Sequence, residues 1–177
     1  KSKELVNHLN DLLANYQIFY QNLRGFHWNV KGSNFFELHA KFEEYYNDAI
    51  EKVDEIAERV LTLEGTPLHS YSAYMKQAEI KEVTGVSDGN RCVKEIVGNL
   101  GILIRKEREI LALAAEIGDD GTQDMINPYI SEQEKNLWRS NIKIKSVLQN
   151  ISKSIMGLKW IRNQSLMYRL RDFMSTN

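Results

Sequence analysis

The sequence has 177 residues and is 42% hydrophobic, enough for one domain with a real core, and two prolines and ten glycines permit long uninterrupted helices. It has no run of 18 apolar residues, its first residues, KSKELVNHLN, lack the apolar stretch of a signal peptide, and its single cysteine, Cys92, excludes an intramolecular disulfide, so we expect a cytoplasmic protein without a membrane partner. The net charge of −1 hides an asymmetry: residues 139–177 hold eight basic residues and one acid, whereas residues 1–138 carry a net −8.

Two stretches near the N-terminus have apolar residues at every third or fourth position, the pattern of a helix that buries one face. The first covers residues 5–30 and ends at a break over residues 32–34, where Ser33 or Asn34 can cap the next helix. The second covers residues 35–63 and ends at Gly65-Thr66-Pro67. We expect two long helices joined by a short turn.

The remaining elements follow a long mixed stretch, which reads as a crossover with one short helix around residues 70–77. A third long helix is predicted from Asp88, its N-cap, to Ile117, with Gly118 closing it. A fourth is predicted to open at Thr122 and to reach Trp138, with Pro128 tolerated in its early turns.

This order of elements predicts an all-α fold: a ferritin-like four-helix bundle over residues 1–138, with one long connection that carries a short helix. Residues 139–177 form an atypical basic extension whose apolar spacing permits one more helix. Periodicity alone fits any ordinary four-helix bundle equally well. The chemistry of the site residues therefore has to distinguish a ferritin-like bundle from the others.

Four residues have the chemistry and the placement of metal ligands: His27, His39, Asp54 and Glu58, with Glu43 as a fifth candidate. Imidazole and carboxylate suit Fe(II) and Zn(II). Taken singly, each has a plain alternative as a surface histidine or a solvated acid. His39 and Asp54 lie 15 residues apart on one predicted helix, roughly 22 Å, so they cannot share an ion within one chain. A two-fold axis that sets this helix antiparallel to its own copy would bring each histidine pair to the partner's acids.

The direction of the side chains favours this intersubunit arrangement. At about 100° per residue from His39, Glu43, Asp54 and Glu58 fall near 40°, 60° and 100°, whereas the apolar seam of the same helix lies near 285°. No glutamate stands three residues before any histidine, so the Glu-x-x-His motif of intrachain di-iron bundles is absent. The candidate ligands therefore face a neighbour rather than the core.

The stretch FHWNVKGSNFFELHAKFEEYYNDAIEKVDEIAERVLTLEGTP, residues 26–67, resembles the Dps family of mini-ferritins, the DNA-binding proteins of starved cells, and the likeness extends more loosely over residues 1–138. The resemblance implies a hollow homo-dodecamer with di-iron ferroxidase sites at its two-fold interfaces. His27 and His39 of one subunit and Asp54 and Glu58 of its mate would be the catalytic metal ligands, and Glu43 would help to hold the second iron.

The resemblance also implies a function: Fe(II) is oxidised, usually by hydrogen peroxide, and stored as ferric mineral, which protects against oxidative damage. Zinc can occupy the same ligands. Trp28 matches an aromatic residue that takes up oxidising equivalents beside the site, with interface packing as an equal alternative. Further acids match two family roles, for each of which a solvated or helix-capping position is the alternative: mineral nucleation for Glu44, Asp48 and Glu51, and pores through which iron enters for Asp119, Asp120 and Asp124.

Residues 139–177 depart from the family pattern. They could bind DNA, pack as a helix on the acidic body, or result from a change of reading frame. A DNA-compacting nucleoid protein with secondary or lost metal chemistry is therefore the alternative function, and a structural helical protein without metal is a third.

Overall fold

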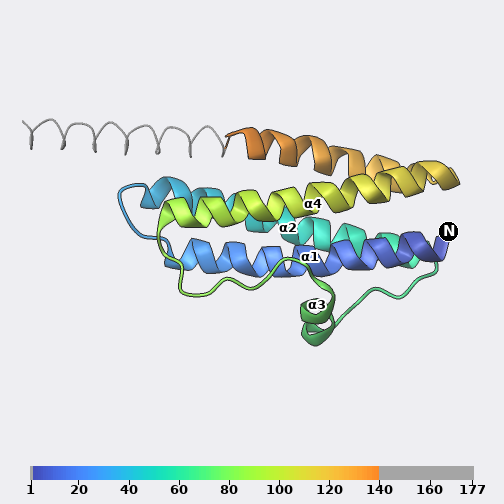
Figure 1. The fold of residues 1–177 in the computed structure, drawn as a ribbon, viewed down its shortest axis with the longest axis horizontal. Coiled ribbons are helices and arrows are strands. Elements are labelled where there is room, and N and C mark those ends of the chain that lie inside the picture. The colour runs from blue at the N-terminus through green and yellow to red at the C-terminus, as the bar shows by residue number, and fades with distance from the viewer. Residues whose placement is uncertain (1, 140–177) are drawn as a thin grey trace, which may run out of the picture. The chain divides into compact units, whose positions relative to one another are not determined.

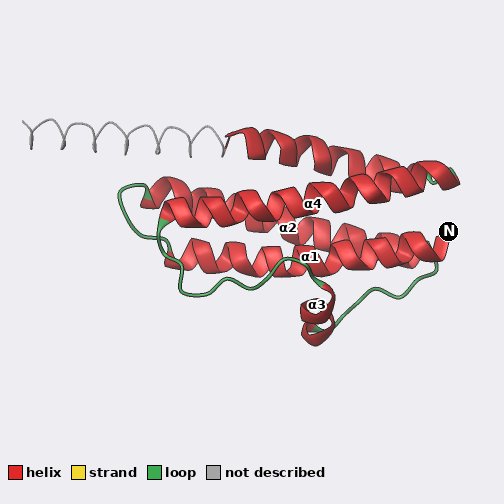
Figure 2. Cartoon of the chain, in the orientation of Figure 1, coloured by secondary structure: helices red, strands yellow, loops and turns green. Residues whose placement is uncertain are grey.

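The computed structural model describes residues 2–139, and every regular element in this range is a helix (Figures 1 and 2). The chain runs through α1 (Ser2–Asn29), α2 (Phe35–Thr62), the short α3 (Tyr71–Gln77) and α4 (Gly89–Ile117), and residues 120–139 are helical as well. Four long helices lie alongside one another and α3 sits on the long connection between α2 and α4. The predicted all-α bundle with a short crossover helix is confirmed. The further helix expected beyond residue 139 lies outside the described residues.

The predicted ends of α4 are confirmed in detail. The Asp88 side chain accepts a hydrogen bond from the Arg91 backbone N–H at 2.8 Å, and Gly118 takes the left-handed conformation (φ 70°) that closes the helix. The last helix begins at residue 120, two residues before the predicted start at Thr122. The reason is Asp119, whose Oδ1 accepts from the Thr122 N–H at 3.1 Å and so caps the helix earlier than the sequence pattern indicates.

The ends of α2 differ from the prediction. Asn34 occupies the N-cap position, but its side chain makes no capping hydrogen bond. At the other end the helix stops at Thr62, and Glu64 (φ 58°) adopts the left-handed conformation in place of a glycine. Gly65 serves close packing instead, because a Cβ atom there would lie 2.6 Å from a Val6 methyl group of α1.

The core is formed by the apolar seams that the sequence predicts. On α1 the seam residues are at most 6% exposed, and they bury a stripe that runs the length of the helix. These residues are Leu5, Leu9, Leu12, Tyr16, Phe19, Leu23 and Phe26, with Val30 directly after the helix. On α2 the matching stripe includes Phe42, Ile56 and Val60, all fully or almost fully buried. The free Cys92 is also buried in α4.

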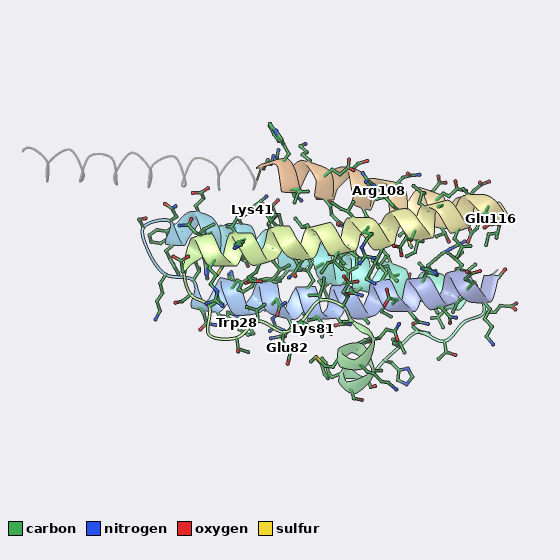
Figure 3. All side chains as sticks on the ribbon, viewed as in Figure 1. Trp28, Lys41, Lys81, Glu82, Arg108 and Glu116 are labelled. Carbon is green, nitrogen blue, oxygen red and sulfur yellow. The ribbon has the colours of Figure 1, made fainter. Side chains whose placement is uncertain are left out.

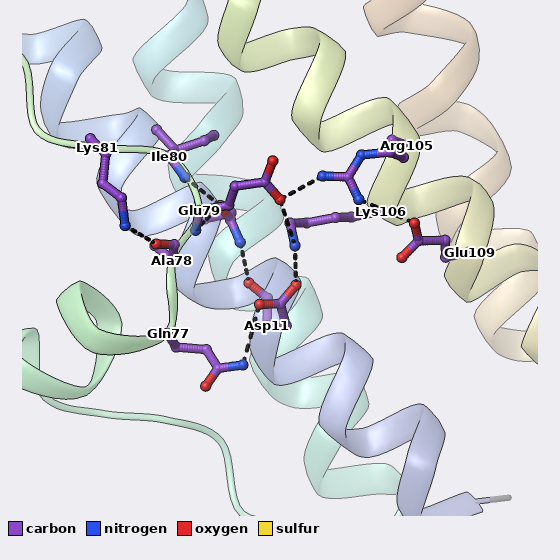
Figure 4. Close-up of polar contacts among 10 residues, drawn as sticks. Asp11, Gln77, Ala78, Glu79, Ile80, Lys81, Arg105, Lys106 and Glu109 are labelled. Atoms are coloured by element: carbon purple, nitrogen blue, oxygen red, sulfur yellow. Dashed lines mark hydrogen bonds and ion pairs between the residues drawn. The ribbon is translucent and has the colours of Figure 1, made fainter.

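Polar contacts hold the crossover against the bundle. The Asn15 side-chain oxygen of α1 accepts hydrogen bonds from the backbone N–H groups of Glu79 and Ile80, at 3.0 and 2.9 Å. Figure 4 shows the neighbouring ion pairs, in which Glu79 binds Arg105 and Lys106 of α4. Because backbone groups without strand or helix partners must be satisfied elsewhere, these contacts fix the course of a long loop. None of the helices within residues 2–139 is long and apolar enough to cross a membrane.

Candidate metal site

The chain brings two histidines together where α1 turns into α2. His27 lies in the last turn of α1 and His39 in the second turn of α2, and the rings stack with centroids 3.7 Å apart at an interplanar angle of 22°. Each ring is linked to the backbone of the other histidine: the His27 Nδ1 is 2.8 Å from the His39 carbonyl oxygen, and the His39 Nδ1 is 2.9 Å from the His27 carbonyl oxygen.

This double link fixes the tautomers of both rings. A carbonyl oxygen only accepts, so each Nδ1 must carry the hydrogen, and the Nε2 of each neutral ring keeps its lone pair. A second hydrogen bond that orients the ring and selects Nε2 as the ligand atom is the usual support of metal-binding histidines. The pair is therefore prepared to offer two nitrogen ligands.

Aromatic side chains enclose the histidine pair. Phe35 stacks on His39 with centroids 5.0 Å apart, and Tyr46 meets His27 edge-on at 5.3 Å. The Tyr46 hydroxyl donates a hydrogen bond to Glu43 Oε1 at 3.4 Å, so Tyr46 contacts both the His27 ring and the Glu43 carboxylate. His27 is only 8% exposed, whereas His39 is half-buried, so the aromatic wall covers the His27 ring more fully.

The carboxylates Asp54 and Glu58 lie far from the histidine pair of the same chain. Both are exposed on α2, and along the helix they stand roughly 22 and 28 Å from His39. Within residues 2–139 of a single chain, no three His, Cys, Asp or Glu side chains come close enough to hold a metal ion. One chain thus presents two imidazoles at one end of α2 and two exposed acids toward the other.

Trp28, labelled in Figure 3, projects into solvent on the side of the bundle that the crossover residue Glu82 also lines. Its side chain is 57% exposed, and the Arg24 guanidinium lies 4.6 Å from the ring centroid. Trp28 also lines a surface groove together with crossover residues 82–87. This geometry permits either of the two roles that the sequence indicated, oxidation or packing.

The three acids predicted for mineral nucleation differ in their surroundings. Glu44 is exposed and pairs with Lys41 at 2.5 Å, and Glu51 is exposed. Asp48 is half-buried and pairs with the buried ammonium of Lys52. Asp48 is therefore tied into the bundle, and the nucleation role of all three stays a prediction.

The three acids predicted for the pore lie around the start of the last helix. Burial acts to raise the pKa of Asp119, but hydrogen bonds from Thr122 and the neighbouring Arg59 guanidinium bring that pKa below its usual range. Asp119 thus has the capping role that the sequence offered as an alternative. Asp120 and Asp124 are exposed, and their role in a pore stays a prediction.

Sequence reasoning missed a polar cluster inside the bundle. Glu107 of α4 is completely buried, and its Oε1 accepts hydrogen bonds from the Tyr16 hydroxyl at 2.7 Å and from the Gln133 amide at 2.5 Å. Burial raises the pKa of Glu107 to about 7, although both hydrogen bonds act in the opposite direction. A glutamate at a core position of the α4 seam, between Leu103 and Ile110, was the available signal.

The comparisons with known proteins agree with this architecture. A family model described as "Ferritin-like domain" matches residues 6–153. The chain is 43% identical over 134 residues to a "DNA protection during starvation protein" of Porphyromonas gingivalis, covering 76% of this chain and 84% of that protein. Its fold also matches a crystal structure of a Dps protein from Vibrio cholerae O1, described as a member of a broad superfamily of ferritin-like diiron-carboxylate proteins, with a TM-score of 0.80 and 52% identity over 81% of this chain and 90% of that one.

A third likeness is to a Dps structure from Listeria innocua soaked with zinc, with 28% identity, a TM-score of 0.77, and coverage of 80% of this chain and 96% of that one. The fold thus defines a ferritin-like protein, and the relatives define the branch: the chain belongs to the Dps family.

Proposed function

We propose that this protein oxidises Fe(II) and stores the ferric product, at sites shared between two copies of the chain. The observation that carries the proposal is the reciprocal hydrogen bonding of His27 and His39, which leaves two Nε2 lone pairs available beside an incomplete ligand set. Membership of a ferritin-like family supports a role in iron storage and protection. Asp54 and Glu58 of a second copy would supply the missing carboxylates.

The chemistry follows from these donor types. Imidazole nitrogens hold Fe(II) first, whereas carboxylates favour the harder, more highly charged Fe(III) and so drive the oxidation. Two Fe(II) ions each give up one electron, and one hydrogen peroxide molecule accepts both electrons as its O–O bond breaks, so no hydroxyl radical needs to escape. Glu43 would assist the second iron, Trp28 would take up stray oxidising equivalents, and zinc can compete for the same ligands.

The wider assembly that we propose is the hollow homo-dodecamer of the Dps family, located in the cytoplasm. Its subunit would be the bundle of residues 1–138, with residues 139–177 as an added extension. Acids would admit iron at the pores and seed the mineral on the inner wall. The pore acids would be Asp120 and Asp124, with Asp119 beside them. The acids that seed the mineral would be Glu44, Asp48 and Glu51.

A double variant, His27→Gly with His39→Gly, tests the site. Fe(II) is added without oxygen, followed by hydrogen peroxide, and ferric absorbance is recorded. The variant should oxidise Fe(II) no faster than buffer, because both nitrogen ligands are gone. The matched control is His8→Gly with His69→Gly, which removes the other two histidines and should leave the rate unchanged. Undiminished oxidation by the first variant would refute the assignment.

DNA binding is the second candidate function, because the relatives are named for DNA protection and residues 139–177 are basic. Lysines neutralise phosphates and release counterions, so binding should weaken steeply with salt. A variant with Lys143, Lys145 and Lys153 all changed to Gln should flatten the salt dependence in a mobility-shift series, by a logarithmic slope of about 3 units if each lysine binds one phosphate. If the intact chain does not shift the mobility of DNA at low salt, DNA binding is refuted.

A further inference from the structure

The outward face of α2 carries exposed apolar side chains among its candidate ligands. Phe36 is 85% exposed, Leu61 is 58% exposed and Ile50 is 40% exposed. They represent three of the seven large hydrophobic side chains that are exposed within residues 2–139. Large apolar groups on one face of a helix indicate a surface that is covered by a partner.

These apolar residues share the direction of the acids. At about 100° per residue from His39, Ile50, Leu61 and Phe36 fall near 20°, 40° and 60°, within the sector between His39 and Asp54. The covering partner must therefore also supply what the metal site lacks. A second copy of the chain meets this condition, because its α2 presents the same carboxylates and the same apolar groups.

An antiparallel pairing of α2 with a second α2 has a specific register. The metal site requires His39 to face the partner's Glu58. Three residues further toward the end of the pair, Phe36 of the first helix then faces Leu61 of the second. The two most exposed apolar residues of the helix thus meet at both ends of the pair. The metal ligands and the apolar residues lead to one register although their chemistry is unrelated.

The inner positions of this register are also informative. A step of four residues inward places Glu43 opposite the partner's Asp54, and a further step places Asn47 opposite the partner's Ile50. Two carboxylates that face each other repel unless a cation lies between them. Without the apolar contacts at the ends, the ligand-bearing middle of the pair would push the helices apart.

We propose that Phe36 and the partner's Leu61 form an apolar bracket at each end of an antiparallel α2 pair, and that this bracket sets the register of the shared metal ligands. The bracket rests on the proposed function, because its register was set by placing His39 opposite the partner's Glu58. Phe36 and Leu61 are positioning residues, since neither touches the metal.

Cysteine cross-linking tests the register directly. The native Cys92 does not interfere, because it is fully buried and burial raises the pKa of its thiol to about 11. Facing helices pack about 8–10 Å apart, so a bismaleimide of similar span should link the Phe36→Cys/Leu61→Cys double variant into a covalent dimer on a denaturing gel. Ile50→Cys alone should also link, because the two copies of position 50 stand only about 4–5 Å apart along the pair.

The matched controls are the single variants Phe36→Cys and Leu61→Cys. In the proposed register, the two copies of position 36 are roughly 37 Å apart, and so are the two copies of position 61. Neither single variant should therefore form a dimer. Linking of Ile50→Cys without linking of the double variant would mean another register, and would overturn the bracket. Linking of either single variant, or of none of the four, would overturn it as well.

Compensating charges provide a second test with a functional readout. Phe36→Lys and Leu61→Glu, each alone, should lower the rate of ferric formation at least about 10-fold, and the combined variant should recover most of the rate, because lysine and glutamate then face each other. Both substitutions are at exposed positions, so circular dichroism of the helices should not change in any of the three variants. Loss without recovery in the combined variant would argue against direct contact.

The outcomes separate the bracket from the proposed function. The expected cross-linking pattern without any iron oxidation would leave the bracket standing and remove the function. Iron oxidation by a wild-type protein whose cysteine variants lack the pattern would leave the function standing and remove the bracket.

Discussion

At the scale of single residues, hydrogen bonds decide which atoms remain available for chemistry. His27 and His39 each commit one nitrogen to a carbonyl and keep the other. Glu107 is buried, and its hydrogen-bond donors Tyr16 and Gln133 are neutral, so burial raises its pKa and favours the protonated form. Its Oε2 and the Gln133 Oε1 are buried atoms without hydrogen-bond partners among the described residues.

The buried Glu107 predicts a specific dependence of stability on pH. The pKa of Glu107 is about 7 in the folded chain and close to the ordinary glutamate value of 4.5 in the unfolded chain, so the folded state binds more protons between these pH values. The contribution of Glu107 to the free energy of unfolding is therefore fully present below pH 4.5 and is lost as the pH rises through 7. The loss amounts to about 3 kcal/mol.

Glu107→Gln keeps a neutral, hydrogen-bonding side chain and removes the titration. Urea unfolding from pH 5 to pH 8 should show wild type losing about 3 kcal/mol relative to this variant, since every other group is shared. Glu134→Gln, at an exposed acid on the last helix, is the control and should follow wild type. Parallel curves for wild type and Glu107→Gln would show that Glu107 does not titrate in this range.

At the scale of the elements, the ends of helices were harder to predict than their cores. The apolar seam of α1 was foreseen residue by residue, because a helix that buries one face must repeat every three to four positions. The start of the last helix and the end of α2 were each displaced by a few residues. Asp119 and Glu64 account for these shifts through contacts and backbone angles that a periodic pattern does not contain.

Gly65 offers a test of how closely α1 and α2 approach. Gly65→Ala would place its Cβ 2.6 Å from a methyl group of Val6, whose branched side chain cannot turn away easily, so we expect a loss of about 1–3 kcal/mol. Gly98→Ala is the matched control, because nothing lies within 4 Å of the added carbon on α4. The control should stabilise the helix by about 0.5–1 kcal/mol in thermal or urea unfolding.

At the scale of the whole molecule, the proposed metal site would be only partly a property of one chain. The spacing of His39 and Asp54 on a single helix already implied that a shared ion needs two copies, because a helix of fixed rise keeps them apart. The stacking of the histidine rings and the aromatic wall around them could not be predicted, since they depend on how the turn at residues 30–34 folds back. The buried Lys52 and Glu107 were missed because charged residues normally mark solvent-facing positions.

The ion pair between Arg59 and Asp119 has a mechanical consequence. Arg59 directly follows Glu58 on α2, and Asp119 directly precedes Asp120 at the start of the last helix. Gly121 leaves the space that the guanidinium fills, since a Cβ there would lie 2.9 Å from it. The ion pair therefore ties the turn of α2 that carries Glu58 to the start of the last helix, which carries Asp120, so that neither segment can move away from the other without breaking this contact.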